Sequence, residues 1–156
     1  MAISRPVPQN TIRISSDPDP LIVGDLVASE AITPGMLIET VLSGTDQVWR
    51  KNASATEQVE IAVALNQPEL NLTIDDDYAA NDLVQAWKPK VGDVFLGIVA
   101  SGQNIAKGDL LQAAGGGYVK EATDTTADKN LAKFKSLSST SGAVTVDTRV
   151  ECERIN

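Results

Sequence analysis

The chain has 156 residues, of which 42% are hydrophobic and 4% aromatic, so we expect one domain with a core of mainly Val, Ile, Leu and Ala. It contains no histidine and one cysteine, which excludes catalysis by an imidazole base, histidine-ligated metal sites and an internal disulfide. The 21 acidic and 13 basic side chains give a net charge of −8, which argues against nucleic acid and anionic membranes as partners.

Residues 1–20 are expected to form an extended, proline-rich arm. Four of the seven prolines lie here, and proline fixes φ and removes a backbone donor, which disfavours helix and central strand. Because the segment also contains Ile and Val, we expect it to become ordered on a partner, with a flexible terminus as the alternative. Residues 1–16 carry a net charge of +2. The side chains expected to make the contact are Ile3, Arg5, Pro6, Val7, Pro8, Ile12, Arg13 and Ile14.

Residues 21–156 are predicted to form a single β-rich domain. Apolar runs at 21–23 and 26–28 flank a Gly-Asp turn, and a Pro-Gly turn precedes another run at 36–38. Residues 59–65 alternate as a strand with one buried face does. Short strands separated by turn signals predict a small β-barrel or β-sandwich. Further candidate strands are 83–87, 94–100, 110–112, 131–137 and 144–155, and the only helical candidates are 76–86 and 126–135.

The domain also shows a candidate internal repeat, with halves at about 21–74 and 90–156. Each half would be a strand–turn–strand unit that buries its apolar face against the other; chance recurrence of small-residue turns is the alternative. The matching segments are 23–25 with 91–93, 27–29 with 99–101, 32–37 with 105–110, and 49–54 with 118–123.

The remaining motifs favour structure over chemistry. The run Asp75-Asp76-Asp77 lacks the spacing of a calcium loop and is interpreted as a solvated turn. The run of glycines at 115–117 precedes a strand start, so it predicts a hairpin turn and not a phosphate loop. We expect both tryptophans, Trp49 and Trp87, in the core, and Cys152 as a small buried hydrophobe. No catalytic residue, cofactor site or metal site is predicted.

One long segment resembles a known family. Residues 92–111, which read GDVFLGIVASGQNIAKGDLL, are followed by the glycine-rich turn and by YVKEAT at 118–123, and preceded by DYAANDLV at 77–84. Together they resemble the capsid decoration, or cement, proteins of tailed bacteriophages. The resemblance implies a small β-rich protein on the outer surface of the expanded head, often trimeric, whose N-terminal arm reaches neighbouring capsid subunits. The length and the apparent duplication of this chain depart from the compact members of the family.

The resemblance and the residues together predict a structural virion protein and not an enzyme. Its expected partners are the major capsid protein and further copies of itself, as a homotrimer, and its expected role is to bridge capsid subunits. No signal peptide and no apolar run of membrane-spanning length is recognised, so synthesis in the host cytoplasm is expected. The alternative is a small-molecule or carbohydrate-binding β module, because the turns at 32–37 and 105–110 are similar to those of SAF-type domains.

Overall fold

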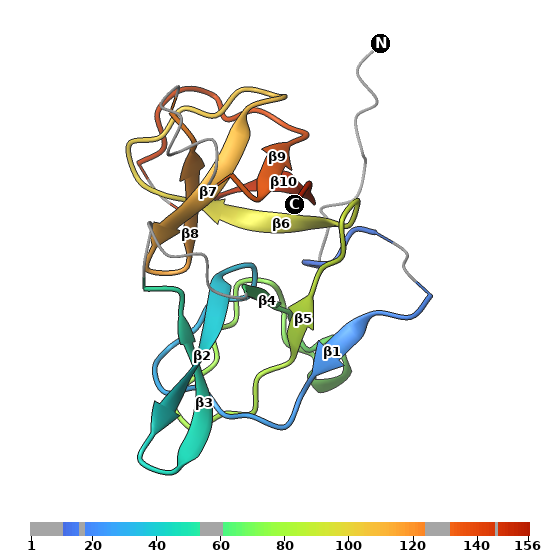
Figure 1. The fold of residues 1–156 in the computed structure, drawn as a ribbon, viewed down its shortest axis with the longest axis vertical. Helices are drawn as coiled ribbons and strands as arrows, with labels where there is room; N and C mark the ends of the chain where they lie inside the picture. The colour runs from blue at the N-terminus through green and yellow to red at the C-terminus, as the bar shows by residue number, and fades with distance from the viewer. Residues whose placement is uncertain (1–10, 16–17, 54–60, 124–131, 146) are drawn as a thin grey trace.

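The fold is mainly β, in a computed structural model that describes residues 11–15, 18–53, 61–123, 132–145 and 147–156. Figure 1 shows two units, a small barrel above an open sheet. The sheet contains β1 (Leu21–Val23), β2 (Leu37–Ser43), β3 (Asp46–Lys51), β4 (Ala62–Ala64) and β5 (Ala86–Lys88), with a short 3₁₀ helix η1 (Pro68–Leu70) between β4 and β5. The barrel contains β6 (Val94–Val99), β7 (Leu110–Gly115), β8 (Tyr118–Glu121), β9 (Phe134–Ser136) and β10 (Thr148–Arg154).

The two units differ in how their strands pair. The sheet has the order β1-β5-β4-β2-β3, and each neighbouring pair is antiparallel. The barrel closes in the order β10-β6-β8-β7-β9, with one parallel pair, β6–β8. The predicted β-barrel-like architecture is therefore confirmed for the second unit, whereas the first unit is an open sheet.

Two hydrophobic clusters fill the molecule, and the middle strands of the sheet separate them. Ile61, Val63 and Leu65 belong to the cluster that includes the barrel interior. Ala62 and Ala64 belong to the second cluster, on the opposite side of β4. The prediction that segment 59–65 has one buried face was therefore wrong for its described part, because both faces of β4 are covered. Alanine on one face leaves the space that this double packing needs.

Some predicted elements need correction. The run 26–28 is not a regular strand, since only isolated bridges join Val27 to Leu83 and Ala28 to Trp49. The helical candidate 76–86 contains turns and the start of β5 instead, because its backbone pairs with residues 26–32. Most of the other helical candidate, 126–135, lies outside the described residues. Strand β3 was not predicted, because only two of its six side chains are buried.

Other predictions about the core are confirmed. Trp49 is 2% exposed and Trp87 is fully buried. Cys152 is fully buried too, and burial raises the pKa of its thiol to about 12. The three glycines at 115–117 turn the chain between β7 and β8, and all three have positive φ. The hairpin prediction was therefore correct.

The two turns that suggested a repeat have one hydrogen bond in common and a glycine with positive φ at the same position. In the first, Met36 N–H donates to Thr33 O at 3.1 Å; in the second, Asp109 N–H donates to Ala106 O at 3.1 Å. Each turn precedes a hairpin, β2–β3 or β7–β8. The strands of the sheet lie between 21 and 88, and those of the barrel between 94 and 154. The duplication itself, and the predicted arm and domain boundaries, stay predictions.

Candidate interaction surface

The described part of the N-terminal arm pairs with the barrel strand β6. Leu96 N–H donates to Ile12 O at 2.9 Å, and Ile14 N–H donates to Val94 O at 2.9 Å. These bonds place residues 12–14 beside β6 as a short additional strand segment (Figure 1). Residues 12–14 are thus held in place by backbone hydrogen bonds to β6 of the same chain.

Side chains of the same segment reach both units. Ile12 is fully buried in the cluster that includes the barrel interior. Its N–H donates to the Asn66 side-chain oxygen at 3.2 Å, just beyond β4. The Arg13 guanidinium lies 5.9 Å from the ring centroid of Trp87 on β5, within the range of a cation–π interaction. The segment therefore bridges the barrel and the sheet.

The arm residues expected to contact a partner fall into two groups. Ile12 lies inside the chain's own core, and Arg13 and Ile14 are partly exposed against β5 and β6. The other predicted contact residues lie outside the described residues: Ile3, Arg5, Pro6, Val7 and Pro8.

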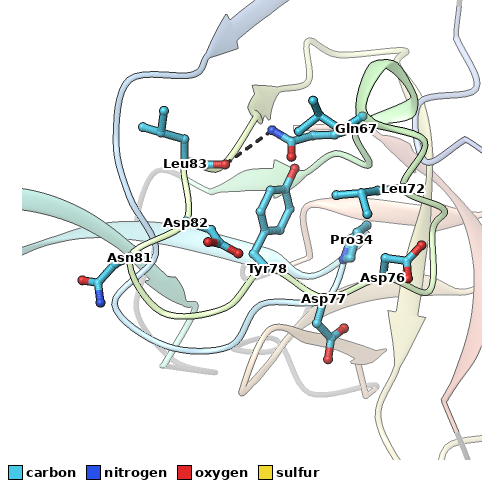
Figure 2. A pocket seen from close by; sticks show the side chains of 10 residues that line it. Pro34, Gln67, Leu72, Asp76, Asp77, Tyr78, Asn81, Asp82 and Leu83 are labelled. Carbon is cyan, nitrogen blue, oxygen red and sulfur yellow. Dashed lines mark hydrogen bonds between the residues drawn. The ribbon is translucent and has the colours of Figure 1, made fainter.

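A hollow of about 400 Å³ lies on the sheet side, next to the residue that holds Ile12. Figure 2 shows Tyr78 at its centre, with Gln67 and Leu83 above and Pro34 and Leu72 beside it. The leucines make this surface apolar although it faces solvent: Leu70 is 62%, Leu72 36% and Leu83 55% exposed. Grouped, exposed apolar side chains of this kind are typical of interaction sites.

Two tight turns build the rim of the hollow, and each is closed by an aspartate. Asp76 Oδ2 accepts a hydrogen bond from Thr73 N–H at 2.6 Å, and Asp82 Oδ2 accepts one from Ala79 N–H at 2.8 Å. In the second turn Asn81 has a φ of 73°, a left-handed conformation that asparagine tolerates better than most residues. The interpretation of the acidic run as a turn is therefore correct at Asp76.

Tyr78 forms the floor of the hollow and is itself 4% exposed. Its hydroxyl donates to Leu65 O at 2.5 Å, which links the hollow to the end of β4. Its backbone forms two bonds with Ile32, at 2.8 and 3.0 Å. Burial raises the pKa of Tyr78 to about 12, so the hydroxyl stays protonated and keeps donating at neutral pH.

The electrostatics of the hollow are acidic. Three carboxylates, Asp76, Asp77 and Asp82, line it, and no Lys or Arg occurs among the described residues of the lining. The hydrogen bonds from Thr73 lower the pKa of Asp76, so its carboxylate is charged at neutral pH. A partner that enters the hollow is therefore favoured if it combines apolar and basic side chains.

Sequence reasoning missed this surface. Its leucines come from two segments, 70–72 and 83. The pairing of β4 with β5 and the hydrogen bond from the Gln67 side chain to Leu83 O bring these segments together. A weak signal existed in the run Glu69-Leu70-Asn71-Leu72-Thr73. There two leucines alternate with polar residues in a segment with no strand partner.

The described residues contain no group of three or more Cys, Asp or Glu side chains that could hold a metal ion. In the same part of the chain, no helix is long and apolar enough to cross a membrane.

Comparison with known proteins finds the fold in a phage structure. No family model matches the chain, and no curated protein matches it either. Among solved structures, the fold is similar to that described as the head fiber gp8.5 N base in bacteriophage phi29, with a TM-score of 0.57. The similarity covers 86% of this chain and 94% of that one, at 13% sequence identity. The two chains thus share a fold over most of their length.

Proposed function

We propose that the protein is a structural component of a bacteriophage virion that binds the outer surface of the head. The observation that carries this proposal is the fold shared with the base of a phage head fiber, which extends over 86% of this chain and 94% of that one. The sequence segments at 77–84, 92–111 and 118–123, which resemble capsid decoration proteins, support the same assignment independently of the fold.

The site supports a role in binding and not in catalysis. Within the described hollow, the carboxylates of Asp76 and Asp82 accept bonds from their own turns, and the Tyr78 hydroxyl donates to Leu65. A carbohydrate-binding module needs polar groups that converge on a ligand, whereas these groups stabilise the chain's own backbone. The exposed leucines suit a protein surface better than a sugar.

The role that we propose is to stabilise the shell by bridging neighbouring major capsid subunits. A closed barrel gives a rigid body, and several weak contacts per molecule give firm attachment. In this proposal the protein attaches as a homotrimer, and the N-terminal arm supplies one of the contacts. Its residues Ile3, Arg5, Pro6, Val7 and Pro8 combine apolar and basic character in an extended segment.

The test is attachment of the purified protein to heads of the encoding phage that lack it, measured by co-sedimentation. A protein without residues 1–10 keeps Ile12 and is expected to fold normally but to bind about tenfold more weakly or worse. Removal of residues 1–16, by contrast, would delete a core residue and confuse attachment with folding.

A charge-matched pair of variants sharpens the test. Arg5→Glu should weaken attachment and reduce its salt dependence, because it removes an exposed charge contact. Lys107→Glu makes the same charge change at an exposed barrel turn and should bind like the wild type. A wild-type protein that does not bind such heads at all would overturn the proposed function.

A further inference from the structure

The hollow around Tyr78 carries negative charge that the described residues do not neutralise. Next to it, Asp75 is paired, because Arg149 Nη1 lies 2.8 Å from its Oδ1 atom. The three acids that line the hollow are Asp76, Asp77 and Asp82. None of these three forms an ion pair with a Lys or Arg in the described part of the chain. A cationic partner would therefore find three uncompensated carboxylates at this surface.

Apolar and acidic side chains lie together on both sides of the hollow. Figure 2 shows Leu83 and Asp82 on one side of the Tyr78 ring. Leu72 and Asp76 lie on the other side. Both carboxylates accept a hydrogen bond from a backbone N–H of their own turn, at 2.6 and 2.8 Å. Their charges are thus fixed in position before a partner binds, which lowers the entropy cost of binding.

The size and the charge of the hollow restrict what can occupy it. Its volume of about 400 Å³ lies in the lower part of the range of ligand pockets, about 300–1,000 Å³, so it admits a few side chains and not a folded domain. Burial of the exposed leucines favours apolar side chains in the occupant. The carboxylates repel nucleic acid and anionic lipid. A second copy of this chain, with a net charge of −8, is a poor source of the cationic group.

We propose that the hollow is a docking site for an extended segment of another protein in which a Lys or Arg lies between two apolar side chains. In an extended chain, alternate side chains share one face, and positions i and i+4 lie about 13 Å apart. The apolar side chains at these two positions cover the leucines, and the cationic group at i+2 meets Asp76 and Asp82. The inference concerns the occupant of the hollow and holds whether or not the protein attaches to heads.

The experiment adds a pentapeptide with blocked ends, Leu-Ser-Arg-Ser-Leu, to the full-length protein and records leucine methyl signals by NMR. The signals of Leu70, Leu72 and Leu83 should shift, whereas that of Leu42, which is 67% exposed on the β2–β3 strand pair, should not. Glutamate in place of the peptide's arginine should weaken binding about fivefold or more, because attraction becomes repulsion. Serine in place of both peptide leucines should weaken it about tenfold or more, because apolar burial is lost.

A matched pair of double variants tests the charges of the hollow. Asp76→Asn with Asp82→Asn removes two charges, and asparagine keeps a side-chain oxygen that can accept the turn bonds. This variant should bind the arginine peptide about fivefold more weakly. The control is Asp109→Asn with Glu121→Gln, which removes two charges from the barrel unit and also changes an aspartate that closes a turn, at 2.7 Å from Ala106 N. It should bind like the wild type.

A second pair tests the leucines without touching the turns. Leu83→Ser, at an exposed position, should weaken peptide binding about fivefold or more, whereas Leu42→Ser should not.

The proposal is overturned if the hollow leucines do not shift at about 10 mM peptide, if Leu42 shifts equally, or if variants and controls bind alike. Shifts of the hollow leucines when the protein alone is concentrated would identify a second copy as the occupant and also overturn it. Since no heads are present, each of these results leaves the proposed attachment to heads unaffected.

Discussion

The barrel and the sheet solve the problem of exposed strand edges in different ways. The barrel is closed, so each of its strands has two partners. The sheet is open: β3 is covered in part by residues 27–29, whereas the outer side of β1 has no partner among the described residues. Unpaired edges are the usual sites of strand addition between chains. Among the described residues, the sheet therefore has an unpaired strand edge and the closed barrel has none.

Exposed apolar side chains follow the same division. In the described part of the chain, six large hydrophobic side chains on the sheet unit are exposed: Leu21, Ile22, Leu42, Leu70, Leu72 and Leu83. The barrel unit has two, Val91 and Ile155, and both lie outside its strands. In the described residues, the closed barrel thus exposes no large hydrophobic side chain on its strands, whereas the open sheet unit exposes six such side chains.

The largest effect is expected where one residue serves both units. Ile12→Ala leaves a cavity in the shared cluster and should lower the free energy of unfolding by about 2–5 kcal/mol. Ile14→Ala, at a partly exposed position on the same segment, should cost less. Urea unfolding measures both changes. Equal losses would show that the arm residue does not belong to the common core.

A smaller difference in the free energy of unfolding is expected between substitutions in the two similar turns, which precede β2 and β7. Gly35 and Gly108 have φ values of +94° and +98°, so alanine is strained at both. At Gly35 the added Cβ would also lie 2.6 Å from Leu96 O in the barrel, whereas at Gly108 nothing lies within 4 Å. Gly35→Ala should therefore cost about 1–3 kcal/mol more than Gly108→Ala in the same unfolding assay. Similar costs would mean that the barrel can move away from the sheet.

The smallest effect at neutral pH comes from two buried acids, one in each unit. Burial raises the pKa of both Cys152 in the barrel and Tyr78 beside the sheet to about 12, from ordinary values of 9.0 and 10.0. Because the unfolded chain ionises first, the contribution of these two groups to stability is constant below about pH 9 and is lost as the pH rises toward 12. Unfolding measured between about pH 8 and pH 11 should show this decline.

Single substitutions assign the two parts of that pH dependence. With Cys152→Ala the decline should start about one unit higher, where Tyr78 alone contributes. With Tyr78→Phe the decline from pH 9 should persist but be less steep above 10. An unchanged profile in both variants would contradict the assignment to these groups.

Local patterns in the sequence predicted those structural features that depend mainly on residue type and on residues nearby in the chain. The glycine run at 115–117, the burial of Cys152 and the core position of both tryptophans follow from residue type and spacing. Strand β3 was missed because its partner, β2, and not its own alternation, determines its conformation. The hollow was missed for a related reason, since Ile32 and Tyr78 pair across 46 positions of sequence.

The double packing of strand β4 has a consequence for how the whole molecule unfolds. Val63 and the flanking residues Ile61 and Leu65 pack in the cluster that includes the barrel interior, whereas the two alanines of β4 pack in the cluster that includes Tyr78. Neither half can lose its order while β4 keeps its own, so melting is expected as one cooperative transition. Binding energy gained at the hollow then raises the stability of the barrel as well. A partner bound to the sheet unit would therefore also stabilise the barrel against unfolding.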